Sequence, residues 1–144
     1  MFFLFLGARE PFESPELERF AHALDIVQRR CPNLTIGQLS TLLRVGMVPA
    51  AEGQFVSVSD IVEHSPGQKY PTIARQLDQL GNGTAKSPGL GLIEKDVDPE
   101  DRRNRWVGIS ERGKLLLYEL DLILAPDIVT TIGQPRPEKA EGQE

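Results

Sequence analysis

Two groups of side chains in this sequence carry hydrogen-bond donors at spacings that suit a negatively charged partner. The first group shares one face of a helix predicted over residues 68–81, because at about 100° per residue four polar side chains fall together there: Gln68, Thr72, Arg75 and Gln79. The second group is three arginines in a predicted turn: Arg102, Arg103 and Arg105. Arginine and glutamine can read base edges in the major groove of DNA, and arginine favours the negative potential of a narrow minor groove.

Each group also has a plainer interpretation. Lys69 and Lys86 flank the predicted helix and could pair with phosphates, which would supply affinity without sequence information. Lysines near a helix end are mostly solvated, a polar helix face commonly faces water, and a charged turn is often only solvated. The residue types alone therefore leave DNA contact and simple solvent exposure both open.

Length and charge limit the organisation of the chain. Its 144 residues, 40% of them hydrophobic, fit one domain or a domain plus a tail and exclude two large domains. The net charge of −5 has the wrong sign for a protein that would coat a polyanion with its whole surface. The charge is uneven, however, because residues 69–114 hold 9 basic and 7 acidic side chains while both flanks are acidic. Contact with nucleic acid would therefore use a local patch.

Several function classes lack support. No HExxH, GxSxG or phosphate-binding loop is present, so no catalytic residue, metal or cofactor is assigned and the chain is not expected to be an enzyme. His22 and His64 lack metal-ligand neighbours, and the single Cys31 excludes an intramolecular disulfide and is expected to be a buried thiol, compatible with a cytoplasmic protein. The apolar start, residues 1–7, is too short for a signal peptide, and no run reaches the roughly 18 apolar residues of a membrane span.

The pattern of apolar residues predicts mainly helices. Ser14 begins a helix that Cys31-Pro32 ends, and Thr35 and Gln38 have capping-box spacing before a helix over residues 36–47. The remaining predicted elements are, in order, a short helix from Ser57 that ends by 65–67, the helix 68–81, a loop over 81–89, strands 92–97 and 105–109 around a charged turn 98–104, and a last helix from Ser110-Glu111 to Pro126. Trp106 is expected to pack within the hairpin.

Three segments near the hairpin follow one another in a specific order. They are Gly91-Leu92-Ile93-Glu94-Lys95, Asp98-Pro99-Glu100-Asp101-Arg102-Arg103 and Ile109-Ser110-Glu111-Arg112-Gly113. This resembles the wing of the MarR family of bacterial transcription regulators, which carries Asp-x-Arg, five residues, an aliphatic residue with Thr or Ser, two residues and Gly. The matching positions here are Asp101, Arg103, Ile109, Ser110 and Gly113. Thr35–Leu39 is similar to the start of the family's second helix, and Thr72–Leu80 is similar to its recognition helix. The resemblance covers roughly residues 14–125.

The resemblance implies a fold that is mainly α with a small β-hairpin, a winged helix-turn-helix plus N- and C-terminal dimerisation helices. It covers a winged-helix domain (14–125, wing about 91–109) and leaves an N-terminal extension (1–13) and a tail (126–144) whose glycines, prolines and mixed charge predict disorder. Helix 68–81 would read the major groove of double-stranded DNA, wing 98–105 would enter the minor groove, and Asp101 would hold Arg103.

The resemblance also implies a homodimeric repressor that a small molecule or oxidation could release from DNA. Pro126 interrupts the C-terminal dimer element, and the loops 48–55 and 81–89 are longer than the family's usual links. Acidic charge and short terminal helices favour an alternative, a winged-helix protein-interaction module that does not bind DNA.

Overall fold

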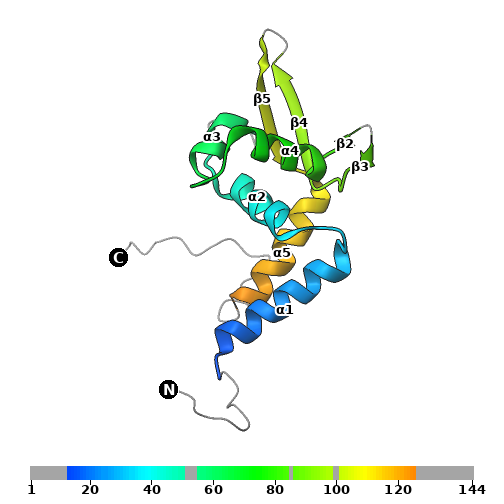
Figure 1. The fold of residues 1–144 in the computed structure, drawn as a ribbon. Coiled ribbons are helices and arrows are strands. Elements are labelled where there is room, and N and C mark those ends of the chain that lie inside the picture. The colour runs from blue at the N-terminus through cyan, green and yellow to red at the C-terminus, as the bar shows by residue number, and fades with distance from the viewer. Residues whose placement is uncertain (1–12, 51–54, 85, 99–100, 126–144) are drawn as a thin grey trace, which may run out of the picture.

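The computed structural model describes residues 13–50, 55–84, 86–98 and 101–125, with backbone alone for 84, 97–98 and 101–104. The chain forms five helices and a small antiparallel sheet in this part, which confirms the predicted fold class (Figure 1). The predicted extension, apart from Glu13, and the predicted tail lie outside the described residues. No helix in the described ranges has the length and apolar composition needed to cross a membrane.

The first two helices begin and end where the sequence predicts. Helix α1 (Pro15–Arg30) starts at Ser14, whose hydroxyl accepts the Leu17 N–H. Helix α2 (Ile36–Met47) starts with a complete capping box: the Thr35 hydroxyl accepts the Gln38 N–H, and the Gln38 side chain accepts the Thr35 N–H. These bonds satisfy backbone donors that have no partner inside the helix.

The next two helices form a compact pair. Helix α3 (Val58–Glu63) follows Ser57, where a short helix was predicted to start, and the Ser57 hydroxyl caps it. Helix α4 spans Tyr70–Leu80. The predicted start of α4 at residue 68 is wrong by two residues. Lys69 is the N-cap and Pro71 occupies the first turn, where a missing N–H costs nothing. Gln68 therefore lies in the preceding turn and does not share the helical face of Thr72.

The three-stranded sheet contains the predicted hairpin and one strand that was not predicted. Strands β4 (Ile93–Asp98) and β5 (Asp101–Ile109) pair antiparallel, and β1 (Val56–Ser57) pairs with the outer side of β5, giving the order β1-β5-β4. We call β4 and β5 together the wing. The predicted turn 98–104 is too long, because Asp101–Asn104 already belong to β5. The three arginines thus lie along a strand rather than at a turn.

The segment predicted as a loop over residues 81–89 contains a second, very small hairpin. Strands β2 (Gly83–Thr84) and β3 (Ser87–Pro88) pair antiparallel. Gly83 has φ +89°, and a Cβ there would lie 2.3 Å from both the Gly89 nitrogen and the Ser87 carbonyl oxygen. The close approach of the two backbones therefore requires glycine, and a segment rich in turn formers can pair despite its low β-propensity.

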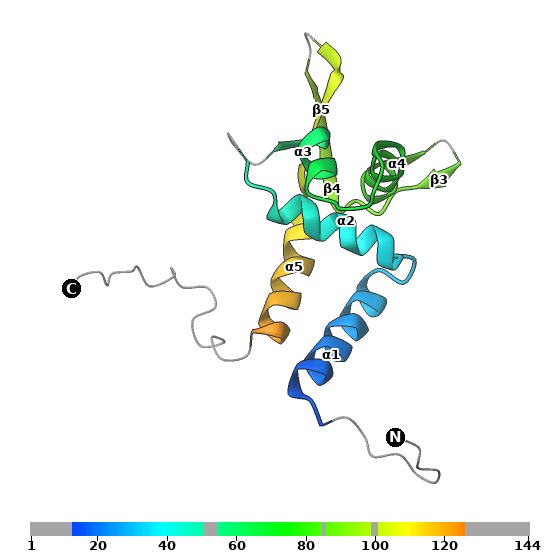
Figure 2. The same ribbon diagram turned by 60° about the vertical axis from the view of Figure 1, so that its left-hand side comes forward.

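The last helix closes the core. Helix α5 (Glu111–Leu124) starts at its predicted cap, Ser110, and packs along α1 at the end of the molecule opposite the wing (Figures 1 and 2). The largest fully buried side chains come from every layer: Leu42, Ile61, Ile73, Leu77, Leu80, Leu92 and Val107. Cys31 is buried, as expected for a structural thiol, and both His22 and His64 are exposed.

Candidate nucleic-acid interface

Helix α4 packs on the core through an apolar face and exposes a polar face on its other side. Ile73, Leu77 and Leu80 are at most 1% exposed, and burial of each side chain stabilises this placement by about 1.5–3 kcal/mol. On the far side Arg75 is exposed, and Thr72 is half-buried beside it. The predicted outward placement of Arg75 is therefore confirmed.

Gln79 is half-buried and its carbonyl end faces helix α2. Its Oε1 accepts a hydrogen bond from Gln38 Nε2 at 2.9 Å, and Gln38 is only 9% exposed. Helical periodicity predicts Gln79 on the outward face and does not predict this partner. The contact follows from the position of Gln79 between the exposed and the buried sides of the helix.

A second glutamine contact between the same two helices was not predicted. Gln76 Oε1 accepts the hydroxyl of Thr41, which is 3% exposed. Helix α2 therefore offers Gln38 and Thr41, three residues apart, to Gln76 and Gln79, also three residues apart. Polar pairs at this spacing on two neighbouring amphipathic helices are a sequence signal that could have revealed the contact.

Asp78, the only acid in α4, is paired with a basic side chain of the wing. Lys95 of β4 donates to Asp78 Oδ1, so the negative charge is countered within the fold. Partial burial and then the nearby charge of Arg105 lower the pKa of Lys95 below that of a free lysine. Lys95 was not among the predicted residues, although its place two positions from the core residue Ile93 puts it on the same sheet face.

Among the described side chains of the wing, the basic and the acidic ones lie on opposite faces. Lys95 pairs with Val107 and Val97 pairs with Arg105 across the hairpin, so Lys95 and Arg105 share a face. Glu94 and Asp96 alternate onto the other face and are exposed. Arg105 is itself exposed. The predicted partners at Asp101, Arg102 and Arg103 have their backbone in β5, and their side chains lie outside the described residues.

The wing is fixed to the end of α4 by backbone hydrogen bonds. The amides of Leu90, Gly91 and Leu92 donate to the carbonyls of Gln79, Gly81 and Leu80 at 3.0, 3.0 and 2.8 Å. Backbone bonds of this kind leave little freedom for a hinge between the two elements. We call α4, residues 90–92 and the wing the reading unit.

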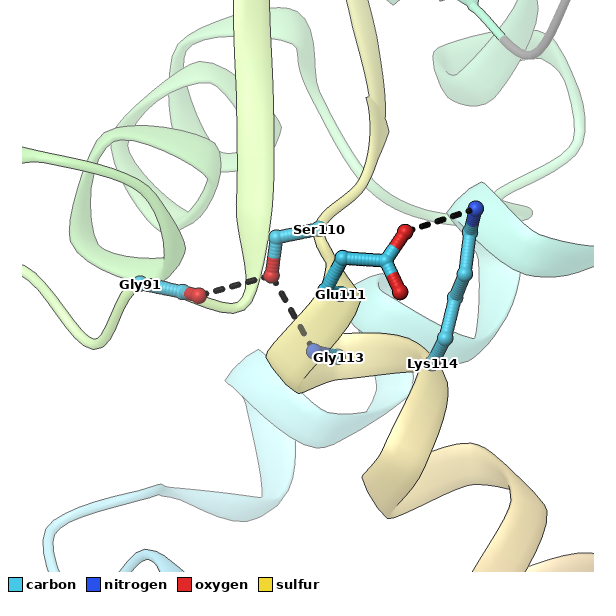
Figure 3. Close-up of polar contacts among 5 residues, drawn as sticks. All are labelled: Gly91, Ser110, Glu111, Gly113 and Lys114. Atoms are coloured by element: carbon cyan, nitrogen blue, oxygen red, sulfur yellow. Dashed lines mark hydrogen bonds and ion pairs between the residues drawn. The ribbon is translucent and has the colours of Figure 1, made fainter.

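Ser110 joins the other end of the wing to helix α5. Its hydroxyl accepts the Gly113 N–H at 3.0 Å and donates to the Gly91 carbonyl at 2.7 Å, while the adjacent Glu111 and Lys114 form an ion pair at 3.5 Å (Figure 3). A Cβ on Gly113 would lie 2.2 Å from the Leu92 carbonyl oxygen. Ser and Gly of the wing motif are thus required by the crossing of α5 beneath β4.

The remaining predicted residues surround the reading unit. Gln68 and Lys69 are exposed immediately before α4, and Lys86 is exposed beside the β2–β3 hairpin. No side chain caps the α4 N-terminus, where Lys69 is the N-cap residue. Trp106 is half-buried in β5, opposite Asp96 and Ser57, in agreement with a packing role.

No protein-family model and no curated protein sequence matches the chain. Solved structures do. A MepR variant from S. aureus bound to an oligodeoxyribonucleotide has a TM-score of 0.58 at 21% identity, over 87% of this chain and 81% of that one. YusO from Bacillus subtilis has a TM-score of 0.54 at 16% identity, over 87% and 78%. A MarR variant from E. coli complexed with operator DNA has a TM-score of 0.50 at 15% identity, over 87% and 83%. The chain therefore has the winged-helix fold seen in MarR-type regulators.

Proposed function

We propose that the protein is a sequence-specific DNA-binding transcription regulator that acts as a repressor. The observation that carries the proposal is the reading unit: an exposed Arg75 on α4, with the α4 acid countered by Lys95, stands at a fixed angle to a wing with a basic face. An α-helix fits the major groove and an arginine-bearing strand fits the adjacent minor groove, so a rigid unit of both matches duplex DNA.

The site residues divide by role. Thr72, Arg75 and Gln79 read bases from α4, and Gln68 and Lys69 contact phosphates before its first turn. Arg102, Arg103 and Arg105 enter the minor groove from β5, with Asp101 supporting Arg103 as in the resembling family. The two DNA-bound structures that share this fold support the assignment.

We propose that the regulator is a homodimer joined through α1 and α5. These two helices pack together and expose large apolar side chains that a monomer would leave in water: Leu17 and Phe20 on α1, and Leu115, Tyr118 and Leu124 on α5. Exposed apolar side chains on one end of a small domain mark an association surface. Two copies would place two reading units on the half-sites of a near-palindromic operator.

We propose that a small apolar molecule releases the DNA. A cavity of about 770 Å³ opens between α2 and α5, lined mainly by apolar residues that include Val45, Val48, Leu117 and Tyr118. A molecule bound there would lie between α2, which contacts α4, and α5, which belongs to the proposed dimer surface. The test is the fluorescence of the dye 1-anilinonaphthalene-8-sulfonate, which should rise with the intact protein and much less with a cavity-filling Leu117→Trp variant. Equal signals would contradict the site.

Selection of bound DNA from a random pool with the full chain tests the function. An enriched inverted repeat, with binding that weakens steeply as salt is raised, is the expected result, because arginine–phosphate contacts release counterions. A pool without enrichment at low salt would contradict the proposal and leave the protein-interaction module as the better interpretation.

Charge-matched variants sharpen this test. Arg75→Ala should weaken binding to the selected site by about 1–3 kcal/mol and relax one base position. A triple variant, Arg102→Ala/Arg103→Ala/Arg105→Ala, should lose most affinity and lower the salt dependence. Arg29→Ala removes the same charge from an exposed position on α1 and should leave binding nearly unchanged. Equal losses in Arg75→Ala and Arg29→Ala would mean that α4 has no special role.

A further inference from the structure

Helices α2 and α4 are joined by an amide relay whose direction is fixed by the backbone. The peptide N–H of Thr35 can only donate, and it donates to Gln38 Oε1 at 3.0 Å. This bond turns the Gln38 oxygen toward the start of α2 and its amide nitrogen toward α4, where the nitrogen donates to Gln79 Oε1 at 2.9 Å. The orientation of both side-chain amides follows from the first donor, since each glutamine has one accepting and one donating end.

The relay determines which end of Gln79 is available to DNA. Its carbonyl oxygen is turned toward α2, and the hydrogen bonds in the described part of the chain leave its NH₂ group unused. A glutamine with both ends available pairs with adenine, accepting from N6 and donating to N7. Gln79 presents donors and keeps its acceptor inward, so it suits a base edge made of acceptors.

We propose that Gln38, which does not face the DNA, is a positioning residue that sets base preference through Gln79. The inference rests on the proposed function. In the wild-type protein Gln79 would favour guanine, through O6 and N7, or thymine, through O4. It would disfavour cytosine, whose N4 is a donor, and would bind adenine less well than guanine, because adenine offers N7 alone as an acceptor beside the N6 donor.

A second contact keeps α4 in place when the relay is altered. Thr41 donates to Gln76 one turn away from the relay. A Cβ on Gly37 would lie 2.7 Å from Gln76 Nε2, so glycine permits this close approach. Because this contact involves neither Gln38 nor Gln79, a change in the relay should reorient one amide without rotating the helix.

The relay can be reversed by a single conservative change. In Gln38→Glu the carboxylate still accepts the Thr35 N–H, since glutamate is a standard residue at this capping-box position. The carboxylate has no proton to donate, so Gln79 must turn its NH₂ group inward and its carbonyl outward. Gln79→Glu reaches the same outcome by another route, because its carboxylate accepts from Gln38 and presents only acceptors to the groove.

The experiment is selection from a random DNA pool with the full-length wild type, Gln38→Glu, Gln79→Glu and Gln79→Ala, each first checked by thermal unfolding. We expect Gln79→Ala to lose preference at one position of each half-site, which identifies the base that Gln79 contacts. At that position the wild type should select guanine or thymine. Both glutamate variants should shift the preference about tenfold toward adenine or cytosine, with the other positions unchanged.

The outcomes separate the two proposals. If the wild type selects no sequence at low salt, the proposed function is wrong and this inference falls with it. If the wild type selects cytosine, or adenine in preference to guanine, at the position that Gln79→Ala identifies, the proposed function stands and the inference about Gln38 is wrong. The relay is also wrong if the motif survives unchanged in both glutamate variants. Gln38→Glu changes a buried residue of the capping box and could fail to fold. Gln79→Glu changes a half-buried residue within the helix, so this variant still tests the inference in that case.

Discussion

The two ends of the molecule differ in how completely they bury their apolar side chains and pair their polar groups. At the reading end, Ile73, Leu77 and Leu80 of α4 are buried, and backbone and side-chain hydrogen bonds fix α4, the wing and α2 to one another. At the other end, α1 and α5 pack together, yet Phe20 stays 53% exposed and Leu115 67%. The reading end buries its apolar contacts within one chain, whereas the other end leaves apolar side chains exposed, which is the surface that the proposed dimer would cover.

The largest predicted effect concerns the incomplete end. Phe20→Glu combined with Leu115→Glu should place charges in the proposed dimer surface and halve the mass in solution. Because a monomer engages a single half-site, affinity for the inverted repeat should fall about 100-fold or more. Sedimentation and titration of the selected DNA check both results. Ile36→Glu, at a residue that is 79% exposed on α2, should leave the mass unchanged. An unaltered mass in the double variant would contradict the dimer surface.

The second effect concerns the junction between the two ends. Gly113→Ala would force a Cβ to within 2.2 Å of a backbone oxygen, which neither α5 nor β4 can avoid without moving. We expect the free energy of unfolding to fall by about 3 kcal/mol. In Gly46→Ala the new Cβ meets only Leu117 Cδ1 at 3.4 Å, and helix propensity should make that variant as stable as the wild type or slightly more so. Denaturant unfolding compares the two, and similar losses would mean that the junction is not tightly packed.

Local signals in the sequence predicted the elements of both ends. Caps at Ser14, Thr35, Ser57 and Ser110 are each within the reach of a few residues, so the helix starts were correct. The start of α4 was predicted two residues early. The apolar stripe of α4 begins only after Pro71 and Lys69 provides no capping side chain, so no local signal fixes the first residue of this helix. Strand β1 was missed because two residues form a strand only when β5 is beside them.

The site could be predicted only where its residues act from one element. Arg75 faces outward because the helical period alone decides it. The partners of Gln79 and Asp78 lie 41 and 17 residues away along the chain, so their contacts depend on how α2 and the wing pack on α4. Helical periodicity therefore indicated a polar face, but it did not indicate which polar atoms of that face are already hydrogen-bonded within the protein.

The third effect compares the serine cap at the junction of the wing and α5 with the serine cap of α1. In Ser110→Ala, the Gly113 N–H and the Gly91 carbonyl both lose a partner at a buried position. We expect a loss of about 1–2 kcal/mol in unfolding free energy, together with weaker DNA binding as the wing loosens. Ser14→Ala removes an equivalent cap from α1 at a more exposed position and should cost about 0.5 kcal/mol, with no effect on binding. Thermal unfolding and DNA titration of both variants measure the difference, and equal binding would show that Ser110 does not position the wing.

The smallest effect tests the two faces of the wing. Lys95→Gln removes a positive charge from the basic face and exposes Asp78 on α4 to the phosphates, so affinity at low salt should fall about twofold to threefold. Glu94→Gln alters the opposite face and should leave affinity the same or slightly higher. Since burial and Arg105 lower the pKa of Lys95, this lysine loses its charge at a lower pH than an ordinary lysine. The difference between wild type and Lys95→Gln should accordingly shrink as the pH is raised into the alkaline range. Equal effects of the two changes would mean that DNA does not distinguish the faces of the wing, and the reading unit would then reduce to α4 alone.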